Sequence, residues 1–230
     1  VIDTQGLLKS AWVARAARAP SFGLDAASAR ERLAARFYDV KVPVPRALHA
    51  VERNRRLVGA VLGYRSLGPA RYGIAVPRDA PAWAPRERYV VMLHAASRAS
   101  KRWPRDRWIA LGRTLGSQGF VAIFPGGTMA EREESAALAR DISGAIAAPA
   151  MGLAEAAALI GHAHGVVGVD TGLTHLAVAL GVPTVGIYRA TSPELTGLHG
   201  GERAVNVGDA SRTPTVAEVA NAIGIAGGAP

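Results

Sequence analysis

Residues 165–183, GVVGVDTGLTHLAVALGVP, carry the clearest pattern of apolar and polar positions in the chain. The stretch opens with an apolar, β-branched run that is typical of a buried parallel strand. After Asp170-Thr171-Gly172, apolar residues recur at helical spacing as far as Leu180. Gly181 and Pro183 then end the helical pattern. We therefore predict a strand, a tight polar turn and a helix.

The turn at residues 170–172 allows two interpretations. The first free N–H groups of a helix point outward at such a turn, and the positive end of the helix dipole lies behind them. A diphosphate fits there, and Gly172 would let its oxygens approach the backbone closely. Alternatively, Asp170 and Thr171 simply cap the helix. His175, one turn further on, favours a binding site.

The same alternation of elements fills the rest of the C-terminal part. Strands are expected at residues 89–95, 120–124, 145–148 and 184–188, and helices at 105–117, 129–141, 153–163 and near 216–223. Strands that alternate with helices through short connections predict βαβ units and a parallel sheet. Ligands of such sheets bind beyond the carboxyl ends of the strands.

The N-terminal part is less regular. We expect a strand end at Val1–Asp3 and a helix at 6–19 with Leu7, Leu8, Ala11 and Trp12 facing inward. Further expected elements are a helical segment at 26–38, a helix at 49–62 and a strand at 72–76. The stretch 77–88 is rich in proline and charge, which indicates a linker. These features predict two domains, residues 1–84 and 85–230.

Composition places the chain among folded globular proteins. Of its 230 residues, 49% are hydrophobic and 20% are charged. No apolar run reaches the roughly 18 residues of a membrane span, and no signal peptide is visible. The absence of cysteine excludes disulfides, and a cytoplasmic location is the simplest interpretation. Because Val1 opens what looks like a strand end, we expect the chain to start within a longer fold.

The net charge of +9 is unevenly distributed. Residues 1–88 hold 16 Lys and Arg against 7 Asp and Glu, whereas residues 89–230 hold 11 of each. A basic half suits an anionic partner such as nucleic acid, phospholipid or a phosphorylated substrate. The excess could equally reflect an Ala- and Arg-rich composition. Nucleic-acid binding ranks last, since only 6% of residues are aromatic and no stacking platform is apparent.

Three further loops are expected at the carboxyl edge of the C-terminal sheet. The first carries Ser97 and Lys101, which suit an anionic ligand but could form only an exposed basic loop. In the second, a glycine turn precedes Glu131, which could hold a ribose diol or merely favour the helix dipole. The third presents Met151 as apolar surface for a base. With residues 170–175, these loops predict a pocket for a nucleoside diphosphate.

Several other site types lose support. Neither G-x-G-x-x-G nor G-x-x-x-x-G-K-[ST] occurs, which weakens ordinary dinucleotide and P-loop interpretations. No G-x-S-x-G elbow supports a serine hydrolase. His162 and His164 have no matched partner for a metal, and we expect no metal site.

The sequence resembles the lipopolysaccharide heptosyltransferases of glycosyltransferase family 9. The resemblance rests on VIDTQGLLKS, HAVERNRRL, YVVMLHAASRASKRWPRDRW, FPGG followed by a glutamate, and VDTGLTHLAVALGVP, which run nearly the whole chain. It implies an α/β fold of GT-B type with two Rossmann-like domains, of which the N-terminal one is incomplete here. It also implies an inverting transfer of heptose from ADP-heptose to the Kdo residue of Kdo2-lipid A.

The resemblance assigns roles by position. Donor-binding residues would be Ser97, Lys101, Glu131, Met151, Asp170, Thr171, Gly172 and His175. Lys101 would neutralise the diphosphate, Glu131 would hold the ribose, and Thr171 and Gly172 would bind phosphate through the helix start. Arg53, Arg55 and Arg56 would face the acceptor and the cytoplasmic face of the inner membrane, where the protein would bind peripherally. No tightly bound cofactor and no nucleic acid are implied.

One departure from the family pattern concerns catalysis. In the family, an earlier βα unit carries the Asp that acts as general base, and that unit is absent from this sequence. The catalytic base is therefore unassigned, since Asp3 lies on a different strand. General-base catalysis typically contributes about 10²–10⁴-fold. The alternative to a working transferase is consequently a nucleotide-sugar-binding fragment without useful catalysis.

Overall fold

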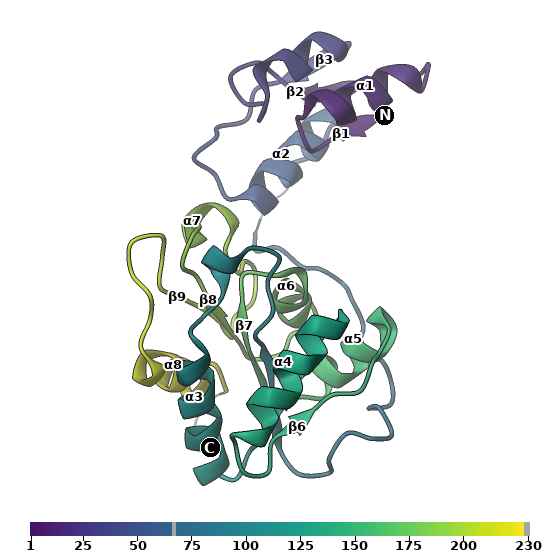
Figure 1. Ribbon diagram of the computed structural model, residues 1–230. Helices are drawn as coiled ribbons and strands as arrows, with labels where there is room; N and C mark the ends of the chain where they lie inside the picture. Colours follow the sequence, from purple (N-terminus) through teal and green to yellow (C-terminus); the bar gives the residue numbers. More distant parts are fainter. Residues whose placement is uncertain (66–67, 228–230) are drawn as a thin grey trace. The chain divides into compact units, whose positions relative to one another are not determined.

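The computed structural model describes residues 1–65 and 68–227, and it divides into two compact units (Figure 1). The first unit comprises Val1–Pro69 with Glu194–Thr196, and the second comprises Ala70–Pro193 with Gly197–Pro230. The division lies earlier in the chain than the boundary predicted between residues 84 and 85.

The stretch that follows the division belongs to the second unit because it contacts that unit along its length. Tyr72 donates its hydroxyl to His199 O at 2.6 Å. Trp83 Nε1 donates to Glu155 Oε1 at 2.9 Å, and the Trp83 ring packs against the hydrophobic core. The predicted linker is therefore attached to helix α5 (Leu153–Gly161). The strand expected at residues 72–76 was wrong, since these residues have no regular secondary structure.

The first unit is built on a three-stranded parallel sheet with the order β1-β2-β3. Its strands are β1 (Ile2–Asp3), β2 (Phe22–Leu24) and β3 (Val40–Val42). Its helices are α1 (Leu8–Ala16), the 3₁₀ helix η1 (Arg32–Phe37) and α2 (Ala50–Leu62). The sheet is parallel because a connection containing a helix or 3₁₀ helix joins each strand to the next.

Small residues form the inner face of α1. Ala11 and Ala14 are buried, whereas Trp12 is 65% exposed and Leu8 is also exposed. The predicted inward orientation of Leu8 and Trp12 was therefore wrong. Ala11 packs with Ala34 of η1, and close approach of two short elements favours small side chains at the contact.

The second unit is a six-stranded parallel sheet with the order β6-β5-β4-β7-β8-β9. Its strands are β4 (Tyr89–Leu93), β5 (Val121–Phe124), β6 (Ile146–Ala147), β7 (Gly165–Val169), β8 (Thr184–Ile187) and β9 (Ala204–Val207). Its other helices are η2 (Ala99–Lys101), α3 (Arg105–Ser117), α4 (Met129–Arg140), α6 (Gly172–Ala179) and α8 (Val216–Gly227). The short helix α7 (Pro193–Thr196) spans the division, since Pro193 belongs to the second unit and Glu194–Thr196 to the first. The predicted α/β fold with parallel sheets is confirmed.

Side chains from the central strands point alternately to the two faces of this sheet. Val90 and Met92 of β4 join one core cluster with buried residues of α3, α4 and α8. Val91 and Leu93 join the other cluster with buried residues of α5 and α6. Helices α3 and α8 lie side by side on the first face (Figure 1). Both faces are covered, which explains why the central strands β4 and β7 are buried along their whole length.

The chain changes direction across the sheet between β4 and β7. From β4 it continues to β5 and β6 on one side, and from β7 it continues to β8 and β9 on the other. The loops after β4 and β7 therefore diverge and leave a crevice at the carboxyl ends of these strands, as open α/β sheets do at such a switch point. No helix in the described part of the chain is long and apolar enough to span a bilayer.

Candidate functional site

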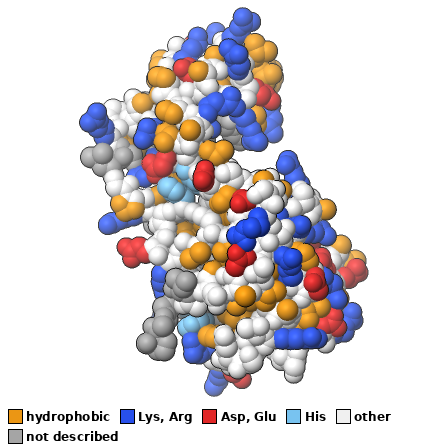
Figure 2. All heavy atoms as spheres, turned by 90° about the vertical axis from the view of Figure 1, so that its left-hand side faces the viewer, with side chains coloured by type: hydrophobic (Ala, Val, Ile, Leu, Met, Phe, Trp, Pro, Cys, Tyr) orange, Lys and Arg blue, Asp and Glu red, His pale blue; other side chains and the backbone are white. Residues whose placement is uncertain are grey.

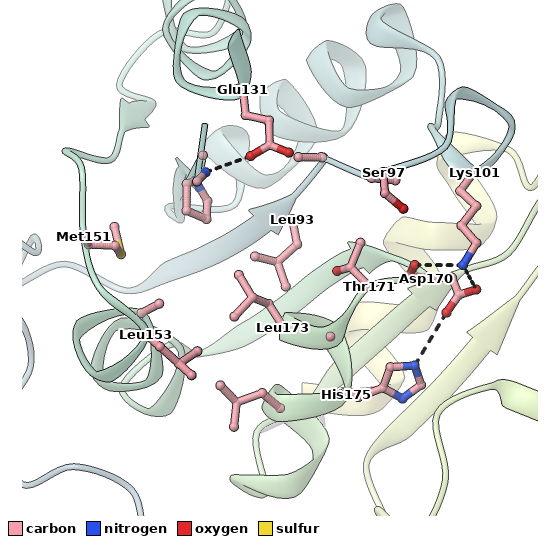
Figure 3. Close-up of a pocket in the computed structure, with 18 of the residues that line it drawn as sticks. Leu93, Ser97, Lys101, Glu131, Met151, Leu153, Asp170, Thr171, Leu173 and His175 are labelled. Carbon is pink, nitrogen blue, oxygen red and sulfur yellow. Dashed lines mark hydrogen bonds and ion pairs between the residues drawn. The ribbon is translucent and has the colours of Figure 1, made fainter. Parts of the chain in front are cut away.

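A cavity of about 970 Å³ lies at the switch point in the second unit. All eight residues predicted to bind the donor line it: Ser97, Lys101, Glu131, Met151, Asp170, Thr171, Gly172 and His175. They come from the loops and the first helical turns that follow β4, β5, β6 and β7, as expected from the parallel sheet (Figure 3). The volume falls within the range of small-molecule sites.

Asp170 is the centre of a polar cluster in this cavity. Lys101 Nζ donates to Asp170 Oδ2 at 2.7 Å, and Thr191 Oγ1 donates to the same oxygen at 3.0 Å. His175 Nε2 lies 3.6 Å from Asp170 Oδ1. The Asp170 side chain is only 11% exposed, so these partners replace most of its water. Lys101 keeps donor capacity for a ligand, because an ammonium group has three N–H donors.

The partners of Asp170 also fix its charge. His175, Lys101 and Thr191 hold the pKa of the Asp170 carboxyl well below its usual range, against the opposing effect of burial. Asp170 is therefore ionised near neutral pH. Its charge orients Lys101 towards the start of α6.

The N-terminus of α6 has no side-chain cap. In the described structure, neither the side chain of Thr171, the N-cap residue, nor that of Asp170 accepts a hydrogen bond from a backbone N–H of the first turn. Thr171 Oγ1 instead lies 3.2 Å from Thr174 Oγ1. No side chain comes within 4 Å of a Cβ placed on Gly172. Of the two interpretations of this turn, simple capping is excluded, and the N–H groups remain available to an anion.

Glu131 has one carboxylate oxygen engaged in the fold. Its Oε2 accepts hydrogen bonds from the N–H groups of Gly127 and Thr128, both at 2.9 Å. Thr128 Oγ1 in turn accepts from Glu131 N, which completes a capping box at the start of α4. These backbone hydrogen bonds lower the pKa of Glu131. This structural role is compatible with the predicted binding role, which stays a prediction, since Glu131 also lines the cavity.

The cavity has a charged end and an apolar end. Figure 3 shows Lys101, Asp170 and His175 on one side, Met151 and Leu153 on the other, and Glu131 above. Leu153 is 71% exposed although it is a large apolar residue. An exposed leucine beside a partly buried methionine offers an apolar surface to a flat ring.

A buried histidine supports the wall of the cavity from behind. His94 directly follows β4 and is 2% exposed. Its Nε2 lies 2.9 Å from Ser135 Oγ, and Ser135 Oγ donates to Glu131 O at 2.9 Å. The hydroxyl therefore accepts from His94, which must carry its proton on Nε2. Burial lowers the pKa of His94, so the ring is neutral.

The three arginines assigned to the acceptor side differ in their availability. Arg53 Nη2 donates to Ser28 O at 2.6 Å, and burial lowers the pKa of its guanidinium. Arg55 pairs with Glu52 at 2.6 Å and also donates to Gly68 O. Arg56 is exposed, with no ion pair among the described residues. Two of the three are thus held in contacts within the first unit.

The carboxylate of Asp3, like the guanidinium of Arg53, already has hydrogen-bond partners within the first unit. Its Oδ2 accepts from Tyr38 at 2.6 Å and from Ser10 at 2.7 Å, and its Oδ1 accepts from Gln5 N at 2.8 Å. The side chain is buried. This carboxylate holds α1 and η1 to the end of β1, which is a structural task.

The sequence analysis did not identify Thr191 as a member of the polar cluster. Thr191 follows β8 and reaches Asp170 only because β8 lies beside β7. No motif surrounds it. Across residues 1–65 and 68–227, no group of three or more His, Cys, Asp or Glu converges as metal ligands would.

Comparison with known sequences connects this cavity to one family. The profile of Glycosyltransferase family 9 (heptosyltransferase) matches residues 1–222. Lipopolysaccharide heptosyltransferase 1 of Pseudomonas aeruginosa is 42% identical over 206 residues, which cover 87% of this chain and 57% of that protein. The Escherichia coli K12 protein of the same name is 38% identical over 208 residues, which cover 87% and 63%. The chain thus spans about three fifths of the length of these relatives.

Solved structures agree with the sequence comparison. E. coli heptosyltransferase WaaC with ADP matches with a TM-score of 0.83 and 36% identity, covering 97% of this chain and 70% of that one. WaaC with ADP-2-deoxy-2-fluoro heptose matches at 0.81 with 35% identity, covering 97% and 69%. E. coli heptosyltransferase II shares the fold at a TM-score of 0.71 and 20% identity, covering 99% and 75%.

Proposed function

The chain belongs to glycosyltransferase family 9, and we propose that it binds ADP-heptose and takes part in heptose transfer to Kdo2-lipid A. The observation that carries the proposal is the Lys101–Asp170–His175 cluster beside the uncapped start of α6. Type I relatives at 38–42% identity favour heptosyltransferase I over II.

The two ends of the cavity orient the donor. The diphosphate would lie at the start of α6, where backbone N–H groups, Lys101 and Ser97 supply donors. The adenine would lie on Met151 and Leu153, and the ribose would lie below Glu131. The free Oε1 of Glu131 accepts from a hydroxyl, while Oε2 remains in the capping box. The heptose would then lie beside Asp170 and His175.

The reaction is an in-line displacement at the anomeric carbon. An acceptor oxygen forms the new bond, and the bond to the β-phosphate oxygen breaks, so that ADP leaves with the electron pair. Negative charge grows on the leaving oxygen, where Lys101 and the start of α6 stabilise it. These groups neutralise the leaving group without a tightly bound cofactor. The general base is not assigned to a residue of this chain.

The acceptor and location follow from the same proposal. Kdo2-lipid A is anionic, and the first unit carries most of the excess positive charge of the chain. We propose that the protein works in the cytoplasm at the inner-membrane surface, which it contacts peripherally.

Calorimetric titration tests donor binding. ADP and ADP-heptose should bind the chain, and the charge-neutral double variant Lys101→Met/Asp170→Asn should lose at least about tenfold in affinity, or ~1.4 kcal/mol. The matched control is Arg105→Met/Asp141→Asn, which deletes an exposed ion pair of the same 2.7 Å length outside the cavity. ADP-heptose binding no tighter than UDP-glucose would contradict the proposal. Donor binding without transfer to Kdo2-lipid A would support the alternative that the chain is a nucleotide-sugar-binding fragment without useful catalysis.

A further inference from the structure

The first unit has a cavity of its own, remote in sequence from every donor-binding residue. It measures about 500 Å³ and is lined by Ala26, Arg32, Leu33, Ala35, Arg36 and Lys41. The two arginines belong to η1 and the lysine belongs to β3, the edge strand of the three-stranded sheet. Three cations and no acid therefore surround one hollow.

The positive charge of this cavity is not balanced by its surroundings. Residues 1–69 hold 12 Lys and Arg against 5 Asp and Glu. All five acids have partners outside the cavity lining: Asp3 with Tyr38 and Ser10, Asp25 with Ser28, Glu31 with Leu8 N, Asp39 with Ser21 and Arg15, and Glu52 with Arg55. None of them pairs with Arg32, Arg36 or Lys41 in the described structure. An anion in the cavity would relieve the repulsion among the three cations.

The frame of the cavity is held in place by buried contacts. Ala34 and Ala35 of η1 are buried, and Tyr38, which ends η1, donates to the buried Asp3. Asp39 then accepts from Ser21 N and Ser21 Oγ, which ties the end of η1 to the start of β2. The backbone that carries these cations is therefore already ordered. Binding an anion does not have to order it first, which lowers the entropic cost of binding.

The lining identifies the chemical class of the ligand. Two arginines can each bind phosphate oxygens in bidentate fashion. Ala26, Ala35 and Leu33, which is 55% exposed, add apolar surface beside the cations. Figure 2 shows Lys and Arg side chains interspersed with apolar ones over the first unit, in the upper part of the view. No aromatic residue lines the cavity, which disfavours a nucleobase.

We propose that the cavity formed by Arg32, Arg36 and Lys41 binds a phosphate monoester carried on a sugar or a lipid. This site is separate from the donor cavity and does not depend on the proposed function. The shared recognition element is a dianionic phosphate next to a carbon skeleton. The size of the cavity fits a phosphorylated monosaccharide or a phospholipid headgroup.

Residue-resolved NMR tests the proposal with soluble probes. The full chain is first saturated with ADP, and glucose 1-phosphate or glucose is then titrated. We expect saturable amide shifts at residues 26, 32–36 and 41 with the phosphorylated sugar and none with glucose. Arg36→Gln and Lys41→Gln should each weaken binding at least fivefold. Lys9→Gln, which removes an exposed lysine from α1 outside the cavity, should leave it unchanged.

Vesicle sedimentation separates the two sources of phosphate. Binding to phosphatidylcholine vesicles that requires added phosphatidic acid, and that falls with Arg36→Gln but not with Lys9→Gln, assigns the site to a lipid headgroup. Loss with Lys9→Gln equal to that with Arg36→Gln, or no response to either probe, overturns the proposal. The amide spectra show whether each variant is folded. If ADP fails to bind, the amide shifts of the first unit are unaffected. That failure of the proposed function can therefore be told apart from a failure of the phosphorylated sugar to bind.

Discussion

Lys101 Nζ lies 2.7 Å from Asp170 Oδ2, and this ion pair joins the loop after β4 to the loop after β7. The two strands are neighbours in the sheet, but their loops diverge to form the cavity. The pair therefore fixes the distance between two walls that a ligand must bridge. It also places a cation at the start of α6 before any ligand arrives, which is preorganisation of the kind that strengthens anion binding.

Asp170→Asn should destabilise the protein in a pH-dependent way. The pKa of Asp170 lies below its unfolded value of about 3.9. The ion therefore contributes stability above that value, and the contribution is lost as pH falls towards the folded pKa. We expect a deficit of about 1–3 kcal/mol at pH 7 that begins to shrink near pH 4 and shrinks further towards about pH 2.

Urea unfolding measured at intervals between pH 7 and about pH 2 checks this prediction. Asp141→Asn is the control, since Asp141 forms an exposed ion pair outside the cavity. A deficit of the same size at every pH would show that the charge of Asp170 is not what stabilises the fold.

Glu131→Gln should separate the two roles of this side chain. The glutamine carbonyl can keep the hydrogen bonds from Gly127 and Thr128, as capping boxes accept either residue. Its NH₂ group then faces the cavity where a carboxylate oxygen stood. ADP affinity should fall about tenfold, by roughly the 1.4 kcal/mol of one charge-assisted hydrogen bond. The affinity for 2′,3′-dideoxy-ADP should not change, because it lacks the diol.

Calorimetry with both nucleotides measures the difference. Thr128→Ala serves as the control, because it weakens the cap by about 1 kcal/mol without altering the Glu131 carboxylate. Equal losses for ADP and the dideoxy analogue would assign Glu131 to the fold alone.

Gly172→Ala and Gly168→Ala should have opposite consequences. A Cβ on Gly172 meets nothing within 4 Å, so the alanine is tolerated and raises helix propensity by up to about 1 kcal/mol. The added methyl nevertheless stands where phosphate would approach the backbone. We expect unchanged or higher thermal stability and weaker ADP binding. Thermal unfolding and calorimetry on the same samples measure both effects.

Gly168 is enclosed, unlike Gly172. A Cβ there would clash with Thr174 Oγ1, within the buried contact between β7 and α6. Overpacking of this kind costs about 1–3 kcal/mol. A Gly172→Ala variant that binds ADP as well as the parent would contradict placement of the diphosphate at α6.

The second unit was predictable because its strands are buried on both faces. β7 was predicted at its observed position, and β4, β5 and β8 agree within two residues. β9 was not predicted, since AVNV is short, only partly buried and contains an asparagine. Ala-rich α1 could not be oriented for a related reason. The apolar pattern predicted correctly that Ala11 faces inward, but with alanines on several faces it does not show that Leu8 and Trp12 face outward.

The candidate site was predictable where loops follow buried strands. Residues 170–172 follow β7 and Ser97 follows β4, so the sheet alone brings them to one edge. The pairing of Lys101 with Asp170 and the contribution of Thr191 depend on side-chain geometry that no local pattern encodes. The sequence also does not reveal that residues 70–88 pack on the second unit. That packing depends on the contact of Trp83 with Glu155 of α5, which is 72 residues further along the chain.

His94 should make the protein less stable in mild acid. The ring donates through Nε2 to Ser135, so Nδ1 is a buried lone pair without a partner, 3.8 Å from Glu134 Oε2. Burial and Arg102 lower its pKa, and Glu134 and Glu131 oppose the shift. The unfolded chain therefore binds the proton more readily than the folded one. Stability should rise with pH through the ordinary histidine range near 6.5.

Replacing His94 by Gln should flatten this slope, because an amide keeps a donor for Ser135 and does not titrate. The urea concentration at the midpoint of unfolding, measured between pH 5 and pH 8, gives the dependence of stability on pH for the parent and the variant. His164, whose pKa burial and Arg88 also lower, should retain the remaining slope. An unchanged slope in His94→Gln would contradict the prediction, because it would mean that the folded ring binds its proton as readily as the unfolded one, with Glu134 offsetting the effect of burial.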